Sequence, residues 1–171
     1  MKSYAGIVSR ETPKEICDLM TQIATILQDK YTLRSGGAGG ADLAFEAGVT
    51  NNNKEIYLPW KSFNGSNSLS YHISPKAIEI AKEYHPAWDR LSDGAKKLMS
   101  RNTYQVLGYN LHVELDPVSF IICWTKDGKA SGGTGQAIRI AEAFNIPVYN
   151  LHNPTYRNLE FYKNIIHNVE N

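Results

Sequence analysis

The sequence predicts a single α/β domain, residues 1–171, built on a doubly wound parallel sheet with strand order 3-2-1-4-5. Short apolar runs alternate with amphipathic segments of helical length, which is typical of parallel strands joined by crossover helices. This alternation breaks after the third apolar run, where the winding direction of such a sheet reverses. Two glycine-rich segments each follow an apolar run and precede a helical one, as loops at the carboxyl ends of strands do.

The first part of the chain is expected to supply three strands, at 4–8, 31–34 and 54–59. A helix begins at Pro13, because Thr12 and Glu15 have the spacing of a capping box. A short helix at 41–48 carries small residues that permit close approach to the sheet. Residues 60–74 are too long for an ordinary strand-to-helix connection, and such segments are often functional.

The second part is expected to contain two helices, a strand buried on both faces, a helix, a strand and a last helix, at 74–83, 92–107, 120–124, 136–144, 146–151 and 155–169. Ser74 and Pro75 form a start signal for the first of these helices, and Gly108 is the stop signal for the second. The strand at 120–124 is apolar throughout, as a strand covered by helices on both sides must be.

The first glycine-rich segment has four glycines in the five positions 36–40. Each glycine costs roughly 0.5–1 kcal/mol of backbone entropy relative to alanine, so this run indicates a ligand that approaches the backbone closely. Free N–H groups at a helix N-terminus bind phosphate. The spacing matches neither the dinucleotide nor the P-loop motif, and a flexible turn is the alternative. The expected contacts are Ser35, Gly36, Gly37, Ala38, Gly39, Gly40 and Asp42.

Three segments should meet at one edge of the predicted sheet, namely those that follow the first, second and fourth strands. The first and last of them add Ser9, Arg10, Lys126, Ser131, Gly132, Gly133, Thr134 and Gly135 to the expected nucleotide site. A guanidinium at Arg10 suits bidentate binding of a phosphate or carboxylate. A solvated surface arginine is the alternative at this position.

Asp42 and Glu46 are the acidic residues nearest the first glycine loop. Asp42 is positioned either to accept a ribose hydroxyl or to complement the helix dipole. Glu46 follows four residues later on the same helix face, so the two are the candidate acid and base if the protein is an enzyme, or else a solvated face.

Asn102 falls at a position where the helical pattern places a core residue. A buried asparagine needs hydrogen-bond partners, which a glycine loop or a base edge would supply; a surface helix breaker is the alternative. Arg101 precedes it and is expected in the same site. Trp60 has an aromatic face on which a base can stack, as have Phe63 and Trp88, although core packing is the commoner use of tryptophan.

Charge and composition argue against several classes of function. A net charge of +1, from 18 basic and 17 acidic residues, excludes a broad basic footprint for duplex nucleic acid. Cys17 and Cys123 and the five histidines lack metal-ligand spacing, so no metal and no required cofactor are expected. Without a signal peptide or an apolar run of membrane-spanning length, we expect a reduced cytoplasmic protein with no membrane partner. A homo-oligomer is left open.

Four motifs in the same order resemble the SLOG superfamily of Rossmann-like nucleotide-binding proteins, above all its DprA-like and YspA-like branches. They are Ile7-Val8-Ser9-Arg10, the segment from Ser35 to Asp42, Arg101-Asn102, and the segment from Ser131 to Gly135. The resemblance covers most of the chain. It implies a Rossmann-like fold with a nucleotide pocket formed by these motifs.

The resemblance implies three functions in order of preference. The first is a sensor or sequestering module for a nucleotide or nucleotide-derived small molecule. The second is an N-glycosidic hydrolase of nucleoside monophosphates, but Ile138 and Arg139 occupy the positions of the two glutamates of the related phosphoribohydrolases. The third is single-stranded DNA binding through Arg10, Arg101, Lys126 and Lys129.

Overall fold

A computed structural model, which describes residues 1–38 and 42–170, shows a five-stranded parallel sheet in the order β3-β2-β1-β4-β5. The strands are β1 (Lys2–Ile7), β2 (Tyr31–Ser35), β3 (Lys54–Ile56), β4 (Ile121–Cys123) and β5 (Val148–Asn150). Strand β1 is central, with Ala5 paired to Arg34 on one side and to Ile121 on the other. The predicted α/β class and strand order are therefore confirmed.

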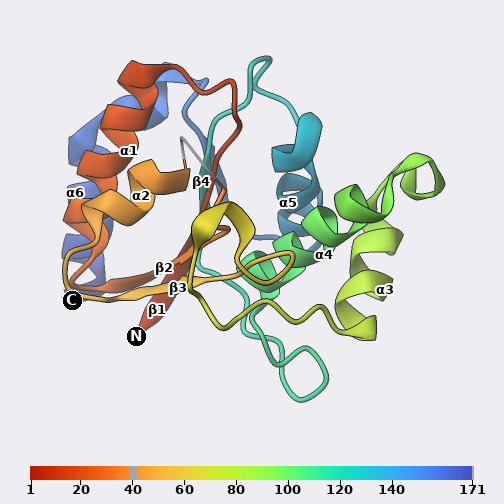
Figure 1. Ribbon diagram of the computed structural model, residues 1–171. Coiled ribbons are helices and arrows are strands. Elements are labelled where there is room, and N and C mark those ends of the chain that lie inside the picture. The colour runs from red at the N-terminus through yellow and green to blue at the C-terminus, as the bar shows by residue number, and fades with distance from the viewer. Residues whose placement is uncertain (39–41, 171) are drawn as a thin grey trace.

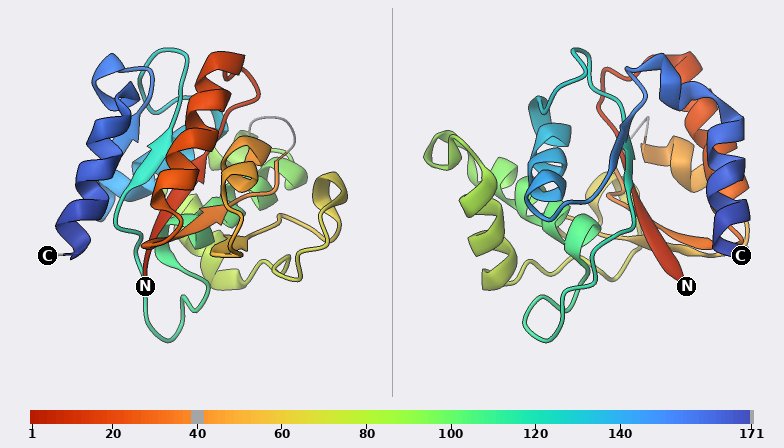
Figure 2. Two further views of the ribbon diagram at one scale, coloured as in Figure 1. Left: turned by 90° about the vertical axis from the view of Figure 1, so that its left-hand side faces the viewer. Right: turned by 180° about the vertical axis from the view of Figure 1, so that it is seen from behind.

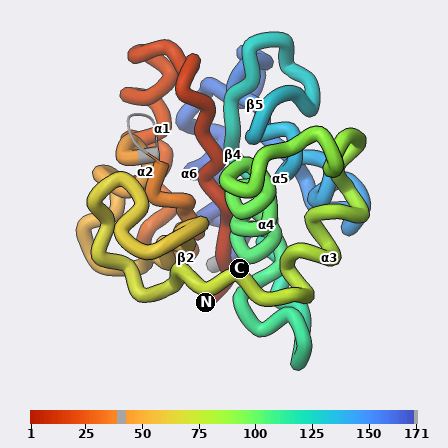
Figure 3. Tube along the Cα trace, turned by 45° about the vertical axis from the view of Figure 1, so that its right-hand side comes forward, coloured from red at the N-terminus to blue at the C-terminus, as the bar shows by residue number. Residues whose placement is uncertain are grey.

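Helices cover both faces of the sheet (Figure 1). One face carries α1 (Lys14–Leu27), α2 (Asp42–Gly48) and α6 (Leu159–Glu170), and the other carries α3 (Pro75–Tyr84), α4 (Asp93–Leu107) and α5 (Gly132–Ala143). Figure 3 shows the two helical layers on either side of the strands. In the part of the chain that the structure describes, no helix is both long and apolar enough to cross a membrane.

The apolar core consists of two clusters, one on each face of the sheet. Because successive side chains of a strand point to opposite faces, Tyr4 packs in the cluster beneath α1 and Ala5 in the cluster beneath α4. In β4, Ile121 packs in the cluster beneath α4 and Ile122 in the cluster beneath α1, and both are fully buried. This double burial explains why the strand is apolar throughout, as the sequence predicted.

Glycines let α2 pack closely between the sheet and α1. The ring of Phe45 lies over Gly6, where a Cβ atom would come within 2.8 Å of it. At the C-terminal end of α2, a Cβ on Gly48 would clash with the carbonyl oxygen of Thr21 in α1. Helix α2 therefore packs closely against the sheet, as expected, and also against α1.

Three predicted helix starts are wrong. Helix α5 begins at Gly132, so the glycines expected to form a loop before residue 136 make up its first turn. Helix α1 begins at Lys14 without a side-chain cap, because the Thr12 hydroxyl donates to the Ser9 carbonyl, 2.7 Å away, instead of bonding to the helix. The last helix begins at Leu159, after a separate 3-10 turn at Pro154–Arg157. By contrast, Ser74 and Ser92 accept hydrogen bonds from Ala77 N and Ala95 N and begin α3 and α4 as expected.

Candidate functional site

The segments that follow β1, β2 and β4 reach the same edge of the sheet. In Figure 1 the connection into α1 and the loop before α5 both lie at the top of the molecule, and Figure 2 shows them at the same end from two other sides. This is the carboxyl edge of a parallel sheet at its switch point, where ligands of open α/β folds bind. The predicted convergence of the three segments follows from the confirmed strand order.

Two adjacent residues of α4 connect the two glycine loops. Arg101 donates through Nη1 to the Gly36 carbonyl in a short hydrogen bond, and to the Tyr57 carbonyl at 3.3 Å. Asn102 donates through Nδ2 to the Gly133 carbonyl at 3.1 Å and accepts from Arg101 Nε at 3.1 Å. Their exposed fractions are only 7% and 5%. Asn102 is thus a buried asparagine that bonds a glycine loop, one of the two roles expected for it.

Gly36 and Gly37 are required by close packing rather than by flexibility. A Cβ on Gly36 would lie 2.6 Å from Arg101 Nη1, so a side chain there would displace the guanidinium. Gly37 has a φ of +63° and would meet Leu58 at 2.6 Å, and a positive φ favours glycine. Ala38 is half-buried next to them. Gly39, Gly40 and the side chain of Asp42 lie outside the described residues.

The second loop leaves the N-terminus of α5 open. Ser131 is the N-cap residue, but its hydroxyl donates to Asp127 Oδ1 at 2.9 Å and makes no bond to the helix. A Cβ on Gly132 or on Gly133 would meet nothing within 4 Å. The first-turn N–H groups of a helix attract anions, so this uncapped and unobstructed end is suited to phosphate.

Two hydroxyls, one from each loop, are buried without a hydrogen-bond partner among the described residues. They are Ser35 Oγ, at the end of β2, and Thr134 Oγ1, in the first turn of α5. Buried polar groups are normally bonded, so the Thr134 hydroxyl is a donor that a bound ligand can use, whereas the Ser35 hydroxyl lies beside the Glu46 carboxyl and acts on its pKa. Gly135 differs from these positions, because a Cβ there would lie 2.5 Å from the Ala130 backbone and glycine is needed for packing.

Sequence inspection missed residues that fix the shape of the second loop. Asp127 accepts from the Lys129 N–H at 3.0 Å, in addition to the Ser131 hydroxyl. These bonds lower the pKa of Asp127. Asn150, at the end of β5, accepts from Thr125 N at 3.2 Å and donates to Thr125 Oγ1 at 2.8 Å. The Asp-Gly pair at 127–128 is a turn signal that could have revealed the first, whereas the bonds of Asn150 span 25 residues.

Two exposed cations lie in the segments that follow β1 and β4. Arg10 and Lys126 are both exposed, and neither side chain has a partner among the residues that the structure describes. Ser9 is half-buried and its Oγ accepts from Glu11 N at 3.2 Å. Arg101 is not an additional surface cation, because it is buried against backbone carbonyls.

An aromatic segment is attached to the first glycine loop. Asn64 Nδ2 donates to the Gly37 carbonyl at 3.3 Å. The neighbouring Phe63 ring lies 5.9 Å from the Arg101 guanidinium and 5.0 Å, edge to face, from the ring of Trp60. Trp60 is 40% exposed and therefore keeps a surface on which a base can stack. Trp88 is instead buried and packs under Lys96.

Glu46 is buried close to the end of β2. Burial raises the pKa of its carboxyl group, and the nearby Lys54 ammonium and Ser35 hydroxyl oppose this rise. Within the described part of the chain, Glu46 Oε2 has no hydrogen-bond partner, and Lys54 Nζ bonds the Glu46 carbonyl at 3.4 Å. Glu46 is therefore not part of a solvated face, which was one of the two alternatives for it.

No family model, curated protein or solved structure matches. The described residues also contain no group of three or more His, Cys, Asp or Glu side chains that could hold a metal ion.

Proposed function

We propose that the protein binds a nucleotide or nucleotide-derived small molecule between its two glycine loops and acts as a sensor or sequestering module. The ligand phosphate lies at the N-terminus of α5, close to the first glycine loop and Arg10. The base stacks on the exposed face of Trp60. The SLOG-like order of the motifs is in keeping with this arrangement.

The open N-terminus of α5 is the observation that carries the proposal. Ser131 turns its hydroxyl away from the helix, and Gly132 and Gly133 leave the space in front of the first turn free. Asn102 holds this turn through the Gly133 carbonyl, so the site is rigid before a ligand arrives. A preformed site of this kind binds more tightly because little has to be ordered on binding.

Native mass spectrometry of the purified protein, followed by calorimetric titration with nucleoside mono- and diphosphates, tests the proposal. Gly133→Val should abolish binding because its side chain enters the space in front of α5. Ala143→Val is the matched control, at an exposed position near the other end of the same helix. Wild-type affinity in a folded Gly133→Val variant, or no nucleotide binding by the wild type, overturns the proposal.

The same titration distinguishes a small ligand from single-stranded DNA. Binding to single strands weakens with salt by a slope of about −0.7 per phosphate contact, whereas a mononucleotide site depends only weakly on salt. Affinity for a nucleotide that changes little between two salt concentrations supports the proposal. Steeply salt-dependent oligonucleotide binding without nucleotide binding contradicts it.

A hydrolase of nucleoside monophosphates is the second candidate, and the buried carboxyl of Glu46 favours it. A raised pKa moves a carboxylic acid toward the range in which it can donate a proton near neutral pH. The two positions at which related hydrolases carry glutamates supply no acid in this chain, since Ile138 is buried and Arg139 bonds the Tyr84 carbonyl at 2.9 Å. Release of free base by the wild type but not by Glu46→Gln would establish the hydrolase.

A further inference from the structure

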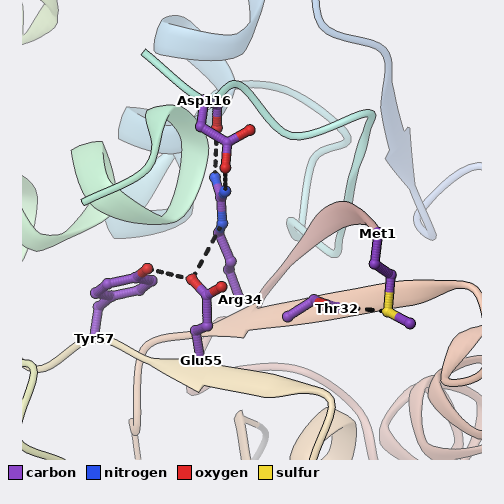
Figure 4. Close-up of polar contacts among 6 residues, drawn as sticks. All are labelled: Met1, Thr32, Arg34, Glu55, Tyr57 and Asp116. Carbon is purple, nitrogen blue, oxygen red and sulfur yellow. Dashed lines mark hydrogen bonds and ion pairs between the residues drawn. The ribbon is translucent and has the colours of Figure 1, made fainter. Parts of the chain in front are cut away.

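A cavity of about 560 Å³ lies between β3, the segment 68–70 and the loop 109–116. Its lining includes none of the described glycine-loop residues, so it is separate from the proposed nucleotide site. Small-molecule sites commonly have volumes of about 300–1,000 Å³. Figure 4 shows the polar side chains that meet there, Arg34, Glu55, Tyr57 and Asp116.

Arg34 fixes two carboxylates at this cavity. Its guanidinium is almost completely buried, with 1% exposed. It donates through Nη2 to Asp116 Oδ2 at 2.6 Å and through Nη1 to the Asp116 carbonyl at 2.7 Å. Its Nε lies 3.5 Å from Glu55 Oε2 and makes no hydrogen bond with any described residue. The Tyr57 hydroxyl makes a short bond to the same Glu55 oxygen.

Each carboxylate keeps one oxygen available. Glu55 Oε1 and Asp116 Oδ1 have no hydrogen-bond partner among the described residues, although both groups are held in position through their other oxygen. The bonds to Arg34 and Tyr57 hold both carboxylates close together before any ligand binds, and such preorganisation lowers the cost of binding.

The charge of the cavity is negative. Glu114 adds a third carboxylate, whose side chain has no partner in the described part of the chain. Lys54 also lines the cavity, and its Nζ bonds the Glu46 carbonyl beneath α2. The lining therefore sets three carboxylates against the two cations Arg34 and Lys54, and this negative balance favours a cationic ligand.

An aromatic wall completes the cavity. Tyr109 stacks on Tyr57, with ring centroids 5.9 Å apart and an interplanar angle of 18°, and is 43% exposed. Tyrosine faces attract organic cations. We propose that this cavity binds a small organic cation of the diamine or polyamine class, with ammonium groups donating to Glu55 Oε1 and Asp116 Oδ1 beside the Tyr109 ring.

Calorimetric titration of the intact protein with putrescine and with spermidine, at constant ionic strength, tests this site. Glu55→Gln should weaken binding about tenfold because a neutral amide replaces a charged acceptor of the ammonium group, and Tyr109→Leu should weaken it several-fold through loss of the aromatic face. Glu83→Gln is the control, because it removes the same charge from an exposed position on α3, outside the cavity. Gly133→Val should bind amines normally, which separates this site from the nucleotide site.

Saturable binding that both cavity variants weaken and Glu83→Gln leaves unchanged supports the proposal. An absence of saturable binding at millimolar amine contradicts it. An equal loss of affinity in Glu83→Gln, or full displacement of the amine by an equal concentration of magnesium ion, shows only diffuse attraction of cations and also contradicts it. Circular dichroism and the unfolding midpoint of each variant confirm that the tested protein is folded.

Discussion

Asn102 Nδ2 lies 3.1 Å from the carbonyl oxygen of Gly133, and Asn102 Oδ1 accepts from Arg101 Nε at the same distance. Arg101 in turn bonds the Gly36 carbonyl. A chain of hydrogen bonds therefore runs from one glycine loop to the other through two neighbouring side chains of α4. Buried networks of this kind are rigid when every member is satisfied and costly when one is removed.

Asn102→Ala should destabilise the protein by about 1–3 kcal/mol, because it leaves the Gly133 carbonyl and Arg101 Nε without this partner in a buried place. Urea unfolding followed by circular dichroism measures the change. Ser100→Ala is the control: Ser100 lies on the same helix and is also buried, but its hydroxyl bonds only the Lys96 carbonyl within α4. Equal losses in the two variants would mean that the connection between the loops contributes nothing specific.

Alanine at Gly36 and at Gly133 should change stability in opposite directions. Gly36→Ala places a methyl group 2.6 Å from Arg101 Nη1 and should cost about 1–3 kcal/mol, the usual range for overpacking. Gly133→Ala meets nothing within 4 Å in the first turn of α5 and should stabilise the protein by about 0.4–1 kcal/mol.

Chemical denaturation of the two glycine variants decides this prediction. A loss of stability in Gly133→Ala would show that the space before α5 is needed for packing, and the argument for an open anion site would fail with it. An unchanged Gly36→Ala variant would show instead that the Arg101 guanidinium moves freely.

The strand order could be predicted from the sequence because it depends on local signals. Apolar runs, capping serines and the glycine segments each specify their own neighbourhood, and the break after the third strand places the switch point. Asn102 could be identified because a polar residue at a core position of an amphipathic helix has to find a partner. These signals also predicted which loops converge.

The predictions that were wrong or incomplete involve tertiary contacts, which the spacing of residues in the sequence does not reveal. Thr12 had the spacing of a cap, but the nearby Ser9 carbonyl competes for its hydroxyl. Arg34 was expected only as the last residue of the second strand, because its main partner Asp116 lies 82 residues away. Arg101 was expected in the nucleotide site, and its hydrogen bond to the Gly36 carbonyl, 65 residues away in the chain, could not be predicted from spacing.

Arg34→Met and Arg34→Ala should separate packing from charge at the cavity. Arg34→Ala leaves a void at a fully buried position and should cost about 2–5 kcal/mol. Methionine fills most of that volume, and Asp116 and Glu55 are exposed enough, at 77% and 44% of their side chains, to be hydrated when the guanidinium is lost. Arg34→Met should therefore cost less than about 1.5 kcal/mol.

Thermal and urea unfolding of the two Arg34 variants give the comparison. A large and equal loss in both would show that the ion pairs, and not the packing of the side chain, stabilise this region.

Glu46→Gln should make the protein more stable at neutral pH, and the gain should disappear in acid. Burial raises the pKa of Glu46 above the ordinary 4.5, so the folded state holds its proton more tightly than the unfolded state does. As pH rises above 4.5, the unfolded chain ionises first and wild-type stability falls; the fall ends above the pKa of the folded state. Glutamine has no proton to lose and avoids this cost.

Urea unfolding of the wild type and Glu46→Gln across the range from pH 4 to pH 8 measures the difference, with Glu83→Gln as an exposed control. The stability gain of Glu46→Gln should grow with pH and then level off, while that of Glu83→Gln stays flat. A gain that shrinks as pH rises would mean that the carboxylate is stabilised in the folded state, with Lys54 outweighing burial. In that case Glu46 would also be a poor proton donor, and the hydrolase would lose the observation that favours it.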